Sequence, residues 1–525
     1  MCGPLRGGSG RFGAFARDRL YAQVRKRPDC EGATRYTQRV MLDRDHCYRA
    51  LKARDARFDG VFFVGVHSTG IYCRPICPAR TPAERRCTFY AHPAAAERAG
   101  FRACLRCRPE LAPGHARVDA LSRLVTEASV RIQRGYLDQH SVDDLALALG
   151  VSARHLRRAI EAELGVSPIE LARTRRLGMA KRLLHDSALS CAEIAFAAGF
   201  SSVRRFNACV REQFGVSPSA LRSGRTQRRR DDGGSLTLRL DYRPPLDWDA
   251  LLGFLAARAI PGVEQVDGGC YRRTVGPAGD ASAGWLELRH DPQPDRPRLH
   301  VTLSLSLTKR PLQIVAALRA LFDLDAEPQV IREQLGRDPK LAPLLARHPG
   351  LRVPGAFDRF EIAVRAVLGQ QVSVAAATTL AQRLAARFGA ALEDGPAGLE
   401  RVFPDAPTLA QIEPEQLRAI GLTGARAATL CTLARALTSN ELTLEGDPEL
   451  VQAQLLALPG VGPWTAQYIA MRALRWPDAL PAGDLVLRRA LGVTTSRACE
   501  HAARTWRPWR AYAVMQLWTN EQERA

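Results

Sequence analysis

No run of apolar residues in this sequence approaches the roughly 18 to 20 that are needed to cross a bilayer. The N-terminal residues are rich in glycine and arginine and lack the apolar segment of a secretory signal. Cysteine is too sparse for a disulfide framework, with 13 in 525 residues. These absences exclude a membrane span and a secreted disulfide scaffold, and we expect the protein to stay in the reducing cytoplasm.

Acidic residues are also in short supply, and lysine is scarce, so arginine dominates the charge. The chain has 54 Asp and Glu against 75 Lys and Arg, a net charge of +21 and a pI of about 10.0. This balance indicates a polyanionic partner, with nucleic acid as the first candidate and a basic solvated surface as the alternative. At 525 residues the chain is too long for one core, and we expect about three to five domains.

Four of the cysteines cluster within one segment, whereas the others are scattered and are interpreted as small buried residues. The first pair has three residues between its cysteines and the second pair has two, which places four thiolates on two loops. A tetrahedral Zn²⁺ site has this arrangement. The predicted ligands are Cys73, Cys77, Cys104 and Cys107.

The residues around these cysteines carry a resemblance. Residues 69–75 are Thr-Gly-Ile-Tyr-Cys-Arg-Pro, and residues 100–107 place Gly-Phe-Arg before the second cysteine pair. Both stretches resemble the N-terminal domain of the Ada adaptive-response regulators. The resemblance implies that Cys73 accepts a methyl group from an alkylated DNA phosphotriester and that Arg102 contacts DNA. Such a nucleophile is plausible because a zinc-bound cysteine stays a thiolate; a purely structural zinc site is the alternative.

The charge of such a cluster depends on methylation. Zn²⁺ with four thiolates carries about −2 charges, and methylation of one sulfur leaves about −1. Since phosphate electrostatics dominates DNA binding, we expect the affinity for DNA to rise after methyl transfer to Cys73.

Residues from about 118 to 225 are basic, helical in period, and contain one plan twice. The two copies begin at Ser141 and Ser190 with Ser-x-x-Asp/Glu capping boxes and end in Gly-Val-Ser-Pro. In each copy a glycine turn, at Gly150 or Gly199, precedes a serine and a second helix. The pattern predicts two helix-turn-helix units.

The doubled pattern resembles the AraC/XylS-type DNA-binding domain across the whole segment. The resemblance implies that the second helices of the two units enter adjacent major grooves; plain helical packing is the alternative. The candidates for contacts to bases or phosphates are Arg154, His155, Arg157, Arg204, Arg205 and Asn207.

Beyond a polar linker, residues 236–240 and 299–307 alternate strictly between apolar and other residues. Alternation of this kind predicts strands with one buried face. Residues 251–259 and 314–322 have helix-like apolar patterns, so we expect an α+β domain.

Two motifs in this α+β domain carry a further resemblance. Residues 244–248 are Pro-Pro-Leu-Asp-Trp, and residues 253–259 are Gly-Phe-Leu-Ala-Ala-Arg-Ala. They resemble the N-terminal domain of AlkA-type DNA-3-methyladenine glycosylase II. The resemblance implies a structural and DNA-flanking role without catalytic residues.

A glycine-containing turn lies near the C-terminus. Residues 458–466 are Leu-Pro-Gly-Val-Gly-Pro-Trp-Thr-Ala, between two apolar runs that predict short helices. Gly460 and Gly462 lack a Cβ, so their N–H groups can approach a phosphate at the start of the second helix. Asp484 follows twenty residues after Trp464. For the turn taken alone, a plain helix connection is the alternative.

The turn and its distance to Asp484 resemble the helix-hairpin-helix base-excision glycosylases, whose opening helix and loop match residues 360–373. The resemblance implies that Asp484 places a negative charge beside the sugar, where positive charge develops as the base leaves. It also implies a pocket for a base flipped out of the duplex, whose aromatic faces attract a cationic alkylated base. The implied pocket residues are Trp464, Tyr468 and Trp518.

Gln371 stands where relatives place the residue that fills the gap left by the flipped base, although an amide fills less apolar space than the leucine of some relatives. Relatives that also cut the strand carry a lysine at the position of Trp464, so we predict a monofunctional glycosylase that leaves an abasic site. Only Cys499 follows Asp484, which argues against an iron–sulfur cluster. No Ile-Pro-Cys-His-Arg motif occurs, so the second methyltransferase domain of full-length Ada regulators is not expected.

We therefore expect a multidomain, mainly α protein, and Met41, where globular patterning begins, is our hypothesis for its natural start. The expected divisions are a disordered basic tail (1–40), an Ada-like zinc and methyl-acceptor domain (41–115), an AraC-type double helix-turn-helix domain (118–225), a linker (226–235), an AlkA-like N-terminal α+β domain (236–343) and an all-α helix-hairpin-helix glycosylase domain (344–525).

The predicted function joins an alkylpurine DNA glycosylase, a zinc-thiolate methylphosphotriester acceptor and an AraC-type transcriptional activator. The expected partner is double-stranded DNA, both alkylated and promoter DNA, with no membrane, no nucleotide cofactor and a monomeric chain. One competing hypothesis is a transcription factor whose glycosylase-like half only binds damaged DNA. Another is an Ada-like half that no longer accepts methyl groups and only targets the enzyme to DNA.

Overall fold

The computed structural model describes residues 44–114, 123–187, 189–223, 235–277, 282–293 and 297–524. The expected tail, the proposed start at Met41 and nearly all of the expected linker lie outside these residues. Among the described helices, none combines the length and the apolar character that a membrane crossing requires.

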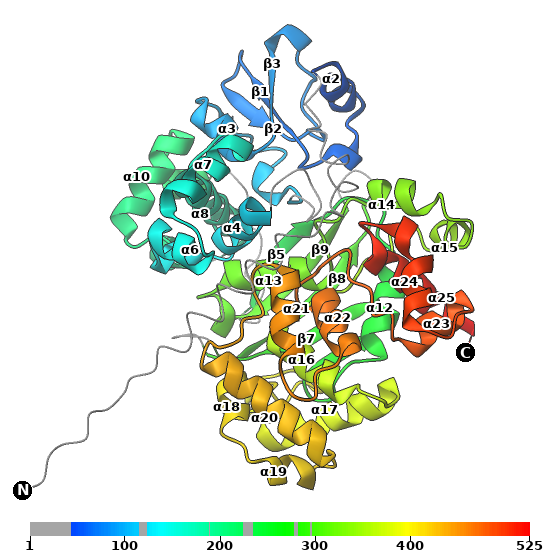
Figure 1. The fold of residues 1–525 in the computed structure, drawn as a ribbon. Coiled ribbons are helices and arrows are strands. Elements are labelled where there is room, and N and C mark those ends of the chain that lie inside the picture. The colour runs from blue at the N-terminus through cyan, green and yellow to red at the C-terminus, as the bar shows by residue number, and fades with distance from the viewer. Residues whose placement is uncertain are drawn as a thin grey trace, which may run out of the picture. The chain divides into compact units, whose positions relative to one another are not determined.

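Residues 44–114, here called the zinc domain, fold around a small four-stranded sheet with the strand order β3-β1-β2-β4. Figure 1 labels β1, β2 and β3 of this sheet. β1 pairs antiparallel with β2 and β3, whereas β2 and β4 run parallel. The parallel pairing of Tyr72 with Ala103 brings the residues that follow both strands to the same end of the sheet. The elements are α2 (Arg44–Ala53), β1 (Phe63–Val66), β2 (Ile71–Cys73), β3 (Cys87–Tyr90), α3 (Pro93–Arg98) and β4 (Arg102–Ala103), with short 3-10 turns at Ala56–Phe58, Glu84–Arg86 and Pro109–Leu111.

Residues 123–223 are helical and contain both predicted helix-turn-helix units. Ser141 and Ser190 form the predicted capping boxes, in which each serine side chain accepts from the third residue of its helix. The second helix of the first unit is capped by Ser152, as expected, whereas that of the second unit is capped by Ser202, one residue after the Ser201 of the repeat. The helices are α4 (Arg123–Gln133), α5 (Tyr136–Gln139), α6 (Val142–Ala148), α7 (Ala153–Leu164), α8 (Pro168–Asp186), α9 (Cys191–Ala197), α10 (Val203–Phe214) and α11 (Pro218–Ser223).

The expected α+β domain contains an antiparallel sheet with the order β5-β9-β8-β7-β6. The side chains of β5 and β9 alternate between buried and half-buried, as the sequence pattern predicts. The predicted helices at 251–259 and 314–322 correspond to α12 and α13. The elements are β5 (Ser235–Asp241), α12 (Trp248–Ala256), β6 (Glu264–Asp267), β7 (Cys270–Val275), β8 (Gly284–Asp291), β9 (Arg298–Ser304), α13 (Pro311–Leu321), α14 (Pro328–Leu335) and α15 (Ala342–Arg347).

One part of the strand prediction is wrong. β9 ends at Ser304, and Leu305–Leu307 form a 3-10 turn instead of the predicted continuation of the strand. The ladder stops because the Ser304 side chain accepts from the backbone N–H of Trp285 at 3.1 Å. Leu307 is fully buried, while Leu305 is 52% exposed. The alternating leucines are therefore also compatible with a 3-10 turn in which only one of the two side chains is buried.

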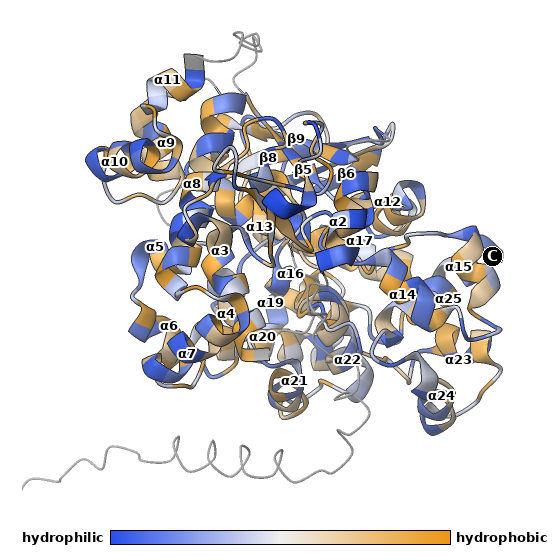
Figure 2. Cartoon of the chain, turned by 90° about the horizontal axis from the view of Figure 1, so that it is seen from above, coloured by the Kyte–Doolittle hydropathy of each residue, from blue (hydrophilic) through white to orange (hydrophobic). Residues whose placement is uncertain are grey.

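Residues 359–524, here called the hairpin domain, are mainly helical, with longer connections between α17 and α18 and between α22 and α23. Most of its helices carry hydrophilic and hydrophobic residues on the same element, which suits packing on one face (Figure 2). The helices are α16 (Arg359–Leu368), α17 (Val374–Phe388), α18 (Ala406–Ala410), α19 (Pro414–Ala419), α20 (Gly424–Thr438), α21 (Pro448–Leu456), α22 (Pro463–Arg472), α23 (Leu485–Leu491), α24 (Ser496–Ala502) and α25 (Arg510–Arg524), with a 3-10 turn at Arg504–Trp506.

The predicted hairpin joins α21 to α22, which contact each other (Figure 1). Gly460 adopts a positive φ of 83°, which glycine reaches without strain. Gly462 is the N-cap residue of α22, followed by Pro463 at the first helical position, where a missing N–H does no harm.

Candidate metal and active sites

The four predicted zinc ligands meet at one end of the zinc-domain sheet. The sulfur atoms of Cys73, Cys77, Cys104 and Cys107 all lie within 4.8 Å of one another. Sulfurs around a tetrahedral Zn²⁺, with Zn–S bonds of about 2.3 Å, lie roughly 3.8 Å apart. The cluster therefore fits this ion with small adjustments of the side chains.

Arg74, the residue after Cys73, contacts the cysteine cluster through its backbone. The backbone N–H of Arg74 donates to the sulfur of Cys107 at 3.4 Å. The Arg74 guanidinium is buried, at 1% exposure, and forms ion pairs with Asp59 and with Asp241 of β5. Partners outside the ligand set orient metal ligands, and the N–H of Arg74 can do so for the sulfur of Cys107.

The four clustered thiols shift one another's pKa values. Hydrogen bonds that the Cys73 thiol donates to Cys104 and the other two cysteines raise the pKa of Cys73 above the ordinary thiol value, and burial adds to the shift. The same contacts lower the pKa of Cys104, because its anion receives the hydrogen bonds. A cation bound by the four sulfurs would favour the thiolate form of each of them.

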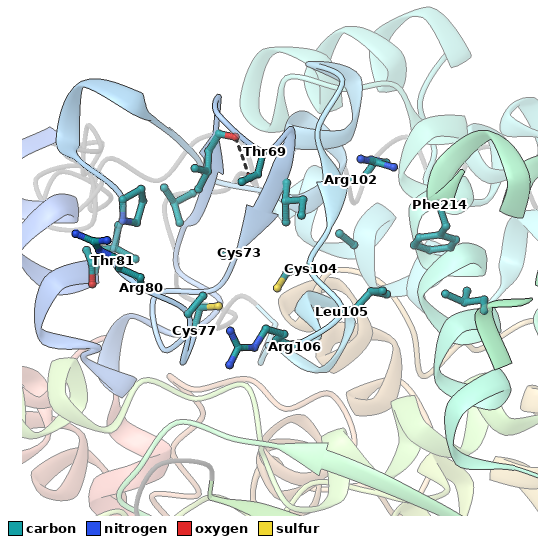
Figure 3. Close-up of a pocket in the computed structure, with 18 of the residues that line it drawn as sticks. Thr69, Cys73, Cys77, Arg80, Thr81, Arg102, Cys104, Leu105, Arg106 and Phe214 are labelled. Carbon is teal, nitrogen blue, oxygen red and sulfur yellow. Dashed lines mark hydrogen bonds between the residues drawn. The ribbon is translucent and has the colours of Figure 1, made fainter. Parts of the chain in front are cut away.

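A pocket of about 460 Å³ opens beside the cluster, and Cys73, Cys77 and Cys104 line it (Figure 3). Much of its wall is apolar, and Phe214 of α10 contributes from the helix-turn-helix segment. Guanidinium groups surround it, and Arg102, a predicted DNA contact, is exposed there. The arginines that line the pocket are Arg80, Arg102 and Arg106.

Contacts from α8 reach the zinc domain next to the ligands. The ammonium group of Lys181 is buried, at 1% exposure, and donates to the carbonyl oxygen of Cys104 at 3.0 Å and to Glu110 at 2.9 Å. Tyr72, adjacent to Cys73, donates to Glu97 at 2.9 Å. These contacts were not predicted, because a single lysine within a helix leaves no signal in the sequence that could have indicated them.

The predicted DNA-reading side chains lie on α7 and α10. Leu156 and Phe206 point into the core with no exposed surface, which turns the neighbouring positions outward. Asn207 is half-buried, and Arg157 lies 3.6 Å from Asp143 in an exposed ion pair. The side chains that the structure leaves exposed are Arg154, His155, Arg157, Arg204 and Arg205.

Asp484 lies where three elements of the hairpin domain converge. It is the N-cap residue of α23, and its Oδ1 accepts from the backbone N–H of Leu487 at 2.9 Å. The indole N–H of Trp464 donates to Oδ2 at 3.0 Å, and that of Trp518 donates to Oδ1 at 3.1 Å. The structure thus brings together the predicted catalytic carboxylate and two of the three predicted pocket aromatics.

The third aromatic, Tyr468, joins the same group. Its ring stacks on Trp464, with centroids 5.3 Å apart and planes 20° apart, and lies 6.3 Å from Trp518. Arg472 donates to the Tyr468 hydroxyl at 2.8 Å. Burial alone would raise the pKa of Tyr468, but the guanidinium groups of Arg472 and Arg258 outweigh it and lower that pKa.

The loop after α16 faces the hairpin. Gln371 is exposed and adopts a positive φ of 54°, which is uncommon for a residue with a side chain. Its neighbour Gln370 donates to the carbonyl oxygen of Gly460 at 2.9 Å and to the hydroxyl of Thr465 at 3.0 Å. Gln370 is not among the predicted site residues, although it lies within the matching stretch 360–373.

Four family models match successive parts of the chain. They are the metal-binding domain of Ada at residues 46–110, a helix-turn-helix domain at 145–224, the AlkA N-terminal domain at 237–358 and the HhH-GPD superfamily of base excision DNA repair proteins at 364–498. The first match covers all four clustered cysteines, and together with their geometry it establishes them as a zinc site.

Similar proteins combine the same parts. A probable bifunctional transcriptional activator/DNA repair enzyme AlkA of Mycobacterium tuberculosis is 43% identical over 91% of this chain and 96% of its own length. DNA-3-methyladenine glycosylase 2 of Escherichia coli is 39% identical over 54% of this chain and 96% of its own length.

The N-terminal part has its own relative. The bifunctional transcriptional activator/DNA repair enzyme Ada of Escherichia coli is 35% identical over 24% of this chain and 34% of its own length. The alignment with the first of these relatives covers 91% of this chain, along which the four family models match in succession. The chain therefore belongs to the family of bifunctional transcriptional activator/DNA repair enzymes of the AlkA type, in which an Ada zinc domain and a helix-turn-helix domain precede a DNA glycosylase.

Proposed function

We propose that the hairpin domain is a monofunctional DNA glycosylase that releases alkylated purines such as 3-methyladenine, with Asp484 as its catalytic carboxylate. The observation that carries this proposal is the position of Asp484 against Trp464 and Trp518, which lie 3.0 and 3.1 Å from its oxygens. A carboxylate at that point can face a sugar whose base rests on the aromatic rings.

The chemistry follows from the charge of the substrate. Alkylation of a purine ring nitrogen leaves the base cationic, so its glycosidic bond is weak. As that bond breaks, its electron pair neutralises the base and positive charge develops on the sugar, where the Asp484 carboxylate stabilises it. A water oxygen then bonds to C1′ and releases a proton, which leaves an abasic site.

The aromatic group selects the base by its charge. Stacked layers lie about 3.4 Å apart, so the 5.3 Å between Trp464 and Tyr468 leaves no room for a base between them. The base therefore stacks on a ring face that the partner ring does not cover. An electron-rich face attracts a cationic base more than a neutral one, by roughly 0.5 to 2 kcal/mol.

The product should stay uncut. A strand-cleaving glycosylase needs an amine that forms a Schiff base with the sugar, and the position in question holds Trp464, whose N–H is bonded to Asp484. We propose that DNA reaches this site along the hairpin, where the backbone of Gly460 and Gly462 meets a phosphate. Gln371, exposed with a positive φ of 54°, enters the gap left by the base.

The experiment that tests this function measures the release of methylated purines from alkylated duplex DNA by the parent and by Asp484→Asn. Release by the parent and loss of about 1,000-fold or more in the variant support the proposal, because removal of one charge-stabilising group costs about that much. Tight binding without release by the parent would favour a regulator that only recognises damage.

We also propose that the zinc domain accepts a methyl group from a DNA methylphosphotriester on Cys73. Zn²⁺ would keep Cys73 in its thiolate form. The thiolate sulfur attacks the methyl carbon, a C–S bond forms, and the C–O bond breaks with its electron pair on the phosphate oxygen. The products are S-methyl cysteine and an ordinary phosphodiester, and no proton is needed.

Two features of the described residues support a methyl acceptor in this cluster, and the resemblance to the Ada domain favours Cys73 among its cysteines. Cys73 lines the 460 Å³ pocket, whose apolar wall suits an alkyl group. Arg80, Arg102 and Arg106 surround the pocket and can hold the anionic phosphates on either side of the neutral triester. A gain of one methyl mass on the Cys73 peptide after exposure to methylated DNA tests the step, and a methyl on none of the four cysteines leaves a structural zinc module.

For the regulator, we propose that α7 and α10 enter adjacent major grooves of promoter DNA. Their outward side chains include Arg154 and Arg204, both exposed. Replacing an arginine that reads a guanine by alanine should lower the discrimination between sequences by about 1 to 3 kcal/mol. Replacing an arginine that holds a phosphate should weaken binding to all sequences equally. Competition binding with two promoter sequences separates these roles.

A further inference from the structure

We propose that Trp464 and Trp518 are positioning residues for Asp484, which rests on the glycosylase function proposed above. Their indole N–H groups hold the carboxylate in a single orientation beside the sugar, in addition to any contact of their ring faces with the base. Catalytic charge and base recognition would then be linked through the same two side chains.

The hydrogen bonds define the orientation of the carboxylate. Trp518 and the backbone of Leu487 both donate to Oδ1, at 3.1 and 2.9 Å, and Trp464 donates to Oδ2 at 3.0 Å. Both carboxylate oxygens are therefore fixed, and rotation about the Cβ–Cγ bond would break three hydrogen bonds together. Hydrogen bonds to an ionised group are the stronger kind, roughly 1.5 to 3 kcal/mol each.

The donors come from separate elements, so the arrangement depends on the tertiary fold. Trp464 lies at the start of α22, Trp518 in the last two turns of α25, and Asp484 at the cap of α23. α23 and α25 are packed together. Both indoles are half-buried, so each has a face outside the core that can serve the base.

Asp484 also has a structural role, because it caps the N-terminus of α23. Asp484 already satisfies the N–H of Leu487, as N-cap aspartates commonly do, and this role alone requires no tryptophan. Indole N–H groups are donors only, and both could have been directed to water at half-buried positions. Their convergence on one carboxylate is the feature that capping does not explain.

The test replaces each tryptophan by phenylalanine, which keeps an aromatic face and removes the N–H. We expect Trp518→Phe to lower the single-turnover rate of 7-methylguanine release about tenfold or more at saturating enzyme, and the half-saturating enzyme concentration to change less than about threefold. Trp464→Phe should act in the same way and provides a second variant if Trp518→Phe does not fold. Trp476→Phe, half-buried in the same domain and not among the residues that donate to Asp484, is the matched control.

A double-mutant cycle separates this role from stacking alone. All variants are titrated with duplex DNA that carries a cationic pyrrolidine ring in place of one deoxyribose, a mimic of the charged sugar. If the indole acts through the carboxylate, Trp518→Phe weakens binding about tenfold in the parent and less than about twofold in Asp484→Ala. An equal loss in both backgrounds shows that the ring only stacks, and it overturns the proposal.

The outcomes also separate this inference from the function on which it rests. A parent protein that releases no methylated purine contradicts the glycosylase function itself. A parent that is active, an Asp484→Asn variant that is not, and tryptophan variants that match the parent rate contradict only the positioning role.

Discussion

The side-chain amide of Gln370 donates a hydrogen bond to the carbonyl oxygen of Gly460 across 2.9 Å. This bond ties the loop that carries Gln371 to the glycine turn between α21 and α22. A second bond from the same amide, to Thr465 at 3.0 Å, fixes its direction. The proposed gap-filling loop and the proposed phosphate-binding turn are thus held as one unit.

We expect Gln370→Ala, which removes both hydrogen bonds of the amide, to weaken binding to duplex DNA with an abasic-site analogue about fivefold, or roughly 1 kcal/mol, because the loop is no longer held to the turn. Water can satisfy the carbonyl group of the exposed Gly460, whereas the buried hydroxyl of Thr465 loses its partner, so we expect the free energy of unfolding to fall by about 1 kcal/mol. Fluorescence anisotropy gives the affinity. The exposed Gln411→Ala is the matched control, and equal affinities of the two variants would contradict the coupling.

The two hairpin glycines should differ in what they tolerate. A Cβ at Gly460 would lie 2.0 Å from the hydroxyl oxygen of Thr429, and the positive φ of 83° adds strain. Thr429 is buried and donates to the carbonyl oxygen of Ala425 at 2.9 Å, so it cannot easily move. We expect Gly460→Ala to lower the free energy of unfolding by roughly 2 to 4 kcal/mol, measured by urea denaturation.

Gly462→Ala tests the phosphate contact without that clash. Its Cβ would meet no heavy atom within 4 Å, and its φ of −91° suits alanine. We expect stability to change by less than about 0.5 kcal/mol, whereas affinity for duplex DNA falls because the methyl group keeps a phosphate from the backbone N–H groups. Undiminished affinity would mean that DNA does not approach this part of the turn.

The sequence located the parts of both sites that depend on local order. The spacing from Trp464 to Asp484 and the two cysteine pairs are short-range features, and the structure places their side chains together. Contacts between residues that are distant in sequence left no such trace. Gln370 and Gly460 are 90 residues apart, and Lys181 is 77 residues from Cys104, so only the packed chain brings them into contact.

The same limit explains the error at the end of β9. Alternating apolar residues predict a strand because side chains of a strand alternate between its faces. Leu307 is buried and Leu305 is 52% exposed in a 3-10 turn, since the side chain of Ser304 ends the ladder. The alternating pattern does not indicate at which residue a side chain, here that of Ser304, replaces a backbone carbonyl group as the acceptor of a hydrogen bond from the neighbouring strand.

Zinc content should follow the four clustered cysteines and no other thiol of the zinc domain. We expect elemental analysis to find one zinc per parent chain after dialysis against a weak chelator, and none in Cys107→Ala, because three thiolates no longer complete the tetrahedral site. Cys87 is buried at 1% exposure in the same domain and lies outside the cluster. Cys87→Ala is therefore the matched control and should keep its zinc.

The carboxylate of Asp325 should make stability depend on pH in a defined direction. Burial would raise its pKa, but Arg319 outweighs burial and, with the N–H of Gly114 at 2.7 Å, lowers the pKa to about 2 from the model-compound value of 3.8. A carboxyl group with a depressed folded pKa contributes stability that is present above the unfolded pKa and is lost as pH falls from about 4 towards 2. Its side chain is only 17% exposed, so we expect a contribution of about 2 kcal/mol at pH 7.

Urea denaturation from pH 7 to pH 3 tests this dependence. Asp325→Asn should be less stable than the parent at neutral pH, and the difference between their free energies of unfolding should become smaller in acid. The exposed Asp267→Asn should follow the parent throughout, and a gap that does not change with pH would contradict the assignment.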